Sequence, residues 1–100
     1  MRHEAERLAA HREGAAAVAL IAGVLAAYEA APPDPLEHAN AIRVAALAAE
    51  AADDRPAALL YWRDGRDRYA ALTGVIERMS GQPGNPAVAE SERRITQLGG

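Results

Sequence analysis

The segment from Tyr61 to Tyr69 holds the residue types best suited to bind a ligand or a partner. Its sequence, YWRDGRDRY, places three of the four aromatic residues and five charged residues within nine positions. The arginines at positions 63, 66 and 68 could hold an anion, and aromatic rings beside them could offer stacking surfaces. This interpretation predicts a partner-binding face formed by Trp62, Arg63, Arg66 and Tyr69.

The same segment also has a simpler, structural interpretation. Asp64 and Arg68 are four residues apart in the order that favours an ion pair on a helix. The same spacing lets the Arg66 guanidinium cover the Trp62 indole, and Trp62 and Tyr69 then belong to a buried stripe. Gly65 inside such a helix costs about 1 kcal/mol relative to alanine. A glycine there indicates the close approach of another helix or a local kink.

Residues for catalysis or metal binding do not form a recognisable set. His3 and His11 share a helix face, but Arg7 lies between them, and His38 follows Glu37 without a second ligand at metal-site spacing. The chain has no cysteine, which excludes disulfides and thiolate chemistry. Its glycines form no phosphate-binding loop. We therefore expect no metal, no cofactor and no enzymatic activity.

The elements that must position these residues are all helical. Prolines at positions 32, 33, 35, 56, 83 and 86 divide the chain into four segments, and no segment shows the alternation of a strand. Asp34 before Pro35 and Asn85 before Pro86 are helix start signals. The prediction is one all-α domain over 1–100, a small antiparallel helical bundle. It has three long helices at about 4–30, 35–52 and 55–79, a loop at 80–85, and a short C-terminal helix at about 86–98.

The first predicted helix is apolar on nearly every face between Gly14 and Tyr28. This run of 15 residues is shorter than the roughly 20 that a membrane span needs, and much of it is alanine or glycine. The residues before it are of mixed charge, unlike an export signal. We expect a helix buried in protein, with no membrane partner and a cytoplasmic location.

The predicted core is thin, and this favours self-association. The chain has 26 alanines and only 24 larger apolar residues, and alanine contributes little free energy when it is buried. A chain of 100 residues can hardly surround an apolar helix on all sides. We therefore expect a homo-oligomer whose interface includes one stripe of the first helix: Val18, Ile21, Leu25 and Tyr28.

Charge and codon-related composition bear on partners and origin. The net charge of −3, from 11 arginines and 14 acidic residues, weakens general nucleic-acid binding, because a phosphate backbone attracts positive charge. The predicted function is a non-enzymatic helical module for protein–protein interaction or assembly, which associates with itself through the alanine-rich apolar helix. The alternative is a nucleic-acid-binding regulator that uses the arginine-rich face of the third helix. The absence of lysine and phenylalanine beside 26 alanines indicates a high-GC bacterium or one of its phages.

Residues 42–70 show a pattern of small and apolar residues around a turn. The small residue Ala46 precedes the turn Asp53-Asp54-Arg55, and Ala58, Leu59 and Trp62 follow it. This pattern resembles a single tetratricopeptide-like hairpin, with Gly65 and Ala70 departing from the usual alanine and proline. No second copy occurs at the 34-residue offset of such repeats. The resemblance implies a helical hairpin and binding to another protein.

Overall fold

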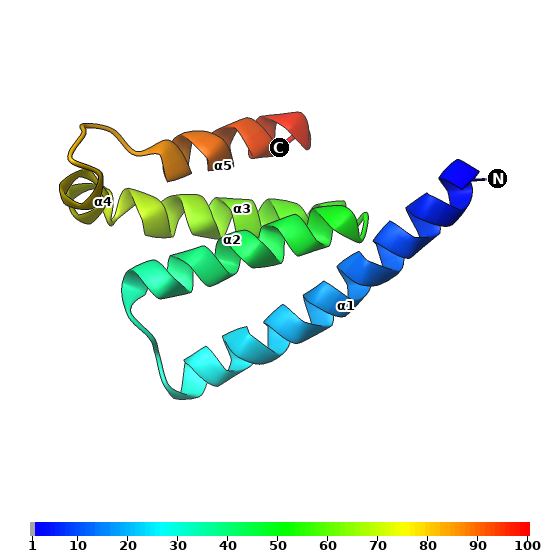
Figure 1. Cartoon of the computed structure of the whole chain (residues 1–100). Helices are drawn as coiled ribbons and strands as arrows, with labels where there is room; N and C mark the ends of the chain where they lie inside the picture. Colours follow the sequence, from blue (N-terminus) through cyan, green and yellow to red (C-terminus); the bar gives the residue numbers. More distant parts are fainter. Residues whose placement is uncertain (1) are drawn as a thin grey trace.

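A computed structural model describes the backbone of residues 2–100 and the side chains of residues 12–100. It contains α1 (Arg2–Ala30), α2 (Pro35–Ala51), α3 (Arg55–Ala70), α4 (Thr73–Ser80) and α5 (Pro86–Gln97) (Figure 1). None of the described residues forms a strand. The prediction of an all-α protein is confirmed.

The helices pack as a chain of neighbours around α2 and α3. Contacts join α1 with α2, α2 with α3, and α3 with α5. Figure 1 shows α1 along one side of α2, with α3 and α5 on the other side. Gly14 of α1 lies against Ala51 and Ala52 at the end of α2. Because α1 contacts α2 alone among the well-packed pairs, it forms the outer layer of the molecule.

Three helices begin with the same combination of a capping side chain and a proline. The Asp34 carboxylate accepts a hydrogen bond from the Leu36 amide at 3.0 Å, and Asn85 accepts one from the Val88 amide at 3.2 Å. Asp54 caps α3 in the same way through the amide of Ala57, at 3.2 Å. These caps satisfy amides that have no partner inside the helix, and they set the starts of α2, α3 and α5.

The predicted helix over 55–79 is wrong in one respect, because the structure divides it into α3 and α4 at Ala71 and Leu72. The Asn85 side-chain amide donates to the Tyr69 carbonyl at 2.8 Å, and the Thr73 hydroxyl donates to the Ala70 carbonyl at 2.9 Å. Side chains thus satisfy carbonyls that a continuous helix would use itself. The chain turns there, and α5 can return beside α3 (Figure 1).

Alanine dominates the core between the helices. Six of the buried apolar residues are alanines (39, 45, 46, 48, 49 and 58), and the large ones are Ile42, Trp62, Tyr69 and Ile95. Gly65 is buried on α3, where an added Cβ would lie 3.5 Å from Ile42 Cγ2. The close approach that the glycine indicates is therefore made by α2.

Replacing Gly65 with alanine is expected to preserve or raise stability. A distance of 3.5 Å is an ordinary van der Waals contact, so the new methyl group fits against Ile42. Alanine also favours the helix by about 1 kcal/mol over glycine. Urea denaturation followed by circular dichroism should show a gain of up to about 1 kcal/mol. A loss greater than about 1 kcal/mol would mean that α2 and α3 cannot accommodate the methyl group.

Candidate interaction surfaces

The structure does not assemble the predicted partner-binding face. Trp62 and Tyr69 are only 1% and 3% exposed, so neither ring is available for stacking with a partner. Arg63 is exposed, whereas Arg66 is half-exposed and its Nε lies 3.3 Å from the Asp67 carboxylate. The partner-binding prediction is corrected for these two rings, and the structural interpretation is confirmed for them: Trp62 and Tyr69 lie on the stripe of α3 that packs into the core.

Trp62 is held by a polar cluster that joins three helices. Its indole nitrogen donates to Glu50 Oε2 at 2.7 Å, and Arg94 Nη1 donates to the other oxygen of Glu50 at 3.1 Å. The Arg94 guanidinium carbon also lies 5.8 Å from the centre of the indole ring. The expected cation over Trp62 was Arg66, four residues away, but Arg94 of α5 occupies that place. No local spacing signals this contact, because Arg94 is distant in the sequence.

A second polar cluster ties α2 to α3 and α5. Arg43 binds Glu90 through two nitrogens, at 2.6 and 3.0 Å, and the Tyr69 hydroxyl donates to Asn40 at 2.6 Å. Burial raises the pKa of Tyr69 above its usual value. A shallow hollow beside this cluster is lined by these four residues together with Leu36, Ile76, Pro86, Ala87 and Arg93. Since each of the four polar groups binds its partner on another helix, the two pairs fasten α2 to α5 and α2 to α3.

The Arg43–Glu90 pair makes stability depend on pH. The hydrogen bond from Arg43 holds the pKa of Glu90 below its ordinary value of 4.5. A depressed carboxyl pKa adds stability above the unfolded-state pKa, and this contribution is lost as the pH falls through the folded-state pKa. We expect Glu90→Gln to be less stable than the native chain at neutral pH, with the difference closing in acid. Urea titrations between neutral pH and about pH 3 test this, and a difference that stays constant would contradict it.

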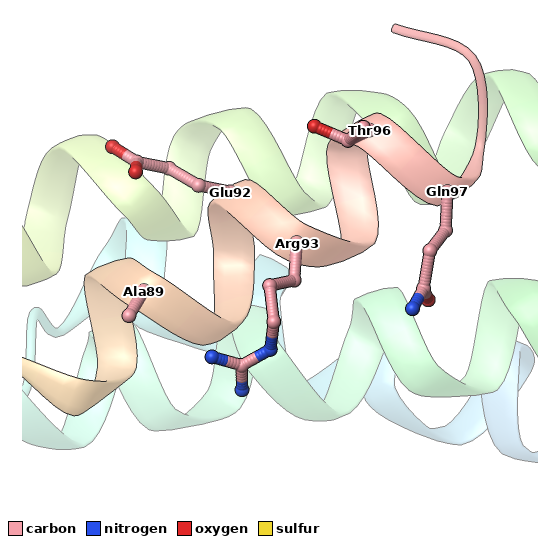
Figure 2. Close-up of a pocket in the computed structure, with 5 residues that line it drawn as sticks. All are labelled: Ala89, Glu92, Arg93, Thr96 and Gln97. Carbon is pink, nitrogen blue, oxygen red and sulfur yellow. The ribbon is translucent and has the colours of Figure 1, made fainter.

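The outer surface of α5 carries a second shallow hollow, lined by Ala89, Glu92, Arg93, Thr96 and Gln97. Figure 2 shows that all five side chains come from this one helix and spread along it in different directions. Binding sites for small molecules usually enclose a ligand between several elements with converging polar groups. This hollow is an open helix surface without such convergence.

Histidine has no metal-site environment where the structure describes it. The His38 ring packs edge-on against Tyr28, with ring centres 5.4 Å apart. No three His, Asp or Glu side chains within 12–100 are placed to hold a metal ion together. The side chains of His3 and His11 lie outside the described residues.

The predicted oligomer interface on α1 faces the protein's own α2. Val18, Ile21, Leu25 and Tyr28 are all half-buried, and they continue the stripe that begins at the buried Gly14. This stripe contacts α2 at both ends, since Gly14 lies against Ala51 and the Tyr28 hydroxyl is 3.4 Å from Glu37. Within one chain, α2 therefore covers much of this stripe, and its role as an oligomer interface stays a prediction.

The opposite side of α1 is uncovered. We call it the outward face, and its exposed residues are Arg12, Ala16, Ala19, Leu20, Gly23, Ala26, Ala27 and Ala30. Ala26 lies at its edge and also lines a hollow between α1, α2 and α3. Leu20 is 75% exposed, the largest value among the exposed large apolar residues, and nothing lies within 4 Å of a Cβ built on Gly23. Only 11% of the stretch from Arg12 to Ala30 is buried. The sequence predicts a helix buried on all sides. In the single chain, α2 covers one side of α1 and the opposite side is exposed to solvent.

Comparisons with known proteins were made with family models, curated proteins and solved structures. None of the three gives a match. The outward face of α1 carries Leu20, which is 75% exposed.

The stretch from Arg12 to Ala30 is also long and apolar enough to cross a membrane, by length and composition alone. Core helices of soluble proteins have the same two properties. In this fold the stretch is attached to α2 near both ends, and α2 carries Glu37, Arg43 and Glu50. Charged side chains are costly in a bilayer, so insertion of α1 together with the attached α2 would carry that cost.

Proposed function

We propose that the protein is a non-enzymatic helical assembly module that associates with copies of itself through the outward face of α1. One observation carries the proposal: α1 is apolar on nearly every face between Gly14 and Tyr28, and α2 covers only one side of it. The other side is exposed, and Leu20 on that side is exposed to 75%. Contiguous apolar surface of this kind marks an interaction site.

Energetics support the same conclusion. Full burial of a leucine side chain contributes about 1.5–3 kcal/mol, and a symmetric pair would bury Leu20 of both copies. The alanines and Gly23 around Leu20 let a partner helix approach closely, which adds dispersion contacts along the face. Association would also compensate for the alanine-rich core, which contributes little within one chain.

The nucleic-acid alternative has less support from the arginines. Among residues 12–100, four arginines lie in ion pairs with acidic side chains: Arg43 with Glu90, Arg66 with Asp67, Arg68 with Asp64, and Arg94 with Glu50. Each pair offsets the positive charge that a phosphate would need. Assembly is therefore the function that the geometry supports best.

Light scattering after size exclusion, across a concentration series, tests the proposal. The native chain should be a dimer or larger assembly at micromolar concentration. Leu20→Glu should raise the dissociation constant at least ~10-fold, because a charge would have to be buried without a partner. Leu60→Glu is the matched control, since Leu60 on α3 is 67% exposed. A native chain that stays monomeric, or equal effects of the two variants, would refute the proposal.

A further inference from the structure

We infer that the occupant of the outward face is the outward face of a second copy, packed antiparallel to the first; the inference rests on the proposed self-association. Six residues of the face follow steps of four and three: Arg12, Ala16, Ala19, Gly23, Ala26 and Ala30. This is the spacing of a seam between two paired helices. Leu20 flanks the seam and is exposed to 75%.

The positions of the seam residues are symmetric about residue 21. Two antiparallel copies of the seam can therefore be aligned position for position. In an antiparallel pair, Ala16 lies opposite the partner's Ala26, and Ala19 lies opposite the partner's Gly23. The Arg12 side chain reaches the end of the partner's helix, at the partner's Ala30. Small residues therefore face small residues along the whole contact, which allows the helix axes to approach to about 8 Å.

Charge at the two ends selects the antiparallel direction. The last turn of α1 contains Glu29 and no basic residue, although a helix C-terminus favours positive charge. The partner's Arg12 would supply that charge at the C-terminal end of each α1. A parallel pair would instead place Arg12 against the partner's Arg12. Glu13 lies almost opposite Glu29 around the helix, since 16 residues make nearly four and a half turns, and so avoids the partner's Glu29.

Cysteine cross-linking can determine whether the two α1 helices are parallel or antiparallel, because the native chain has no cysteine. Ala16→Cys and Ala26→Cys are prepared separately, and both positions are exposed. In the antiparallel pair, a cysteine at position 16 lies about 15 Å along the helix axis from position 16 of the partner, and the same holds for position 26. This distance is beyond the reach of a disulfide. Position 16 of one copy does, however, lie opposite position 26 of the other, within disulfide reach. Mild oxidation should give the covalent dimer only when the variants are mixed. Ala89→Cys, on the outer surface of α5 (Figure 2), gives the level of random collision.

Light scattering on the same reduced variants distinguishes a failure of the antiparallel inference from a failure of the proposed self-association. A dimer in which each variant cross-links with itself is parallel, and overturns the inference while self-association stands. A dimer with no cross-linking above the Ala89→Cys level has its interface elsewhere, and overturns both the inference and the assignment of the face. A chain that is monomeric, including one that binds phosphatidylcholine vesicles through Leu20, overturns the self-association and the inference together.

Discussion

Trp62→Ala is expected to lower the free energy of unfolding by about 3–5 kcal/mol, the range for removing a large aromatic side chain from a core. Trp62 is 1% exposed and packs with Ala46, Ala49, Ala58 and Ile95. Alanine neighbours have short side chains and can do little to fill the space that the ring leaves. Urea titration followed by circular dichroism measures the loss, which would leave a small domain close to unfolded.

Two further variants separate the contributions at this site. Trp62→Phe keeps an aromatic ring but removes the indole N–H that donates to Glu50 at 2.7 Å, so its loss should be intermediate. Tyr61→Ala, at the half-buried neighbouring position, should cost less than Trp62→Ala. If Tyr61→Ala cost as much as Trp62→Ala, the burial of Trp62 would not be what stabilises the core.

Gly14→Ala and Gly23→Ala are expected to have opposite effects, although they make the same change in the same helix. A Cβ at Gly14 would lie 2.6 Å from Ala51 C and 2.6 Å from Ala52 N. Those are backbone atoms of α2 that cannot turn away, so α1 must move off α2. We expect a loss of about 1–3 kcal/mol. At Gly23 nothing lies within 4 Å, and the better helix former should add up to about 1 kcal/mol.

The free energies of unfolding of the two variants are measured by urea titration, and the local stability of α1 by amide hydrogen exchange. Both measurements use solutions dilute enough to keep the chain monomeric. Gly14→Ala should speed exchange along α1, since the helix loses its fixed position against α2. Gly23→Ala is the matched control for the helix propensity of alanine. Equal gains in stability for both variants would show that α1 does not pack on α2 through Gly14.

The boundaries of the fold could be predicted where local chemistry sets them. Asp34 with Pro35 and Asn85 with Pro86 begin helices in the structure as in the prediction, because capping needs only neighbouring residues. The break at Ala71 could not be predicted in this way. It depends on the Asn85 amide reaching the Tyr69 carbonyl, 16 residues earlier. Apolar spacing continues through the break and so indicates one helix.

The stripe of α1 predicted as an oligomer interface lies against α2 in the structure, and the opposite stripe is exposed. Since α1 is apolar all round, periodicity could not show which stripe packs against α2. Gly14 determines which stripe packs against α2, because only a residue without a Cβ permits the close approach to Ala51. Likewise, Trp62 could be read as a binding residue until Glu50 and Arg94 were seen to satisfy its polar edge. Contacts between distant residues decide both cases.

The alanine-rich core also bears on how this protein responds to temperature. The heat-capacity change of unfolding grows with the apolar area that becomes exposed and falls with the polar area, and it averages about 12–15 cal/mol/K per residue. Here the helices are joined by small methyl groups and by polar fastenings such as Arg43–Glu90. The heat-capacity change per residue should therefore fall below that average. A smaller value flattens the stability curve, so the fold would keep a similar stability in the cold and in the warmth, without a pronounced optimum.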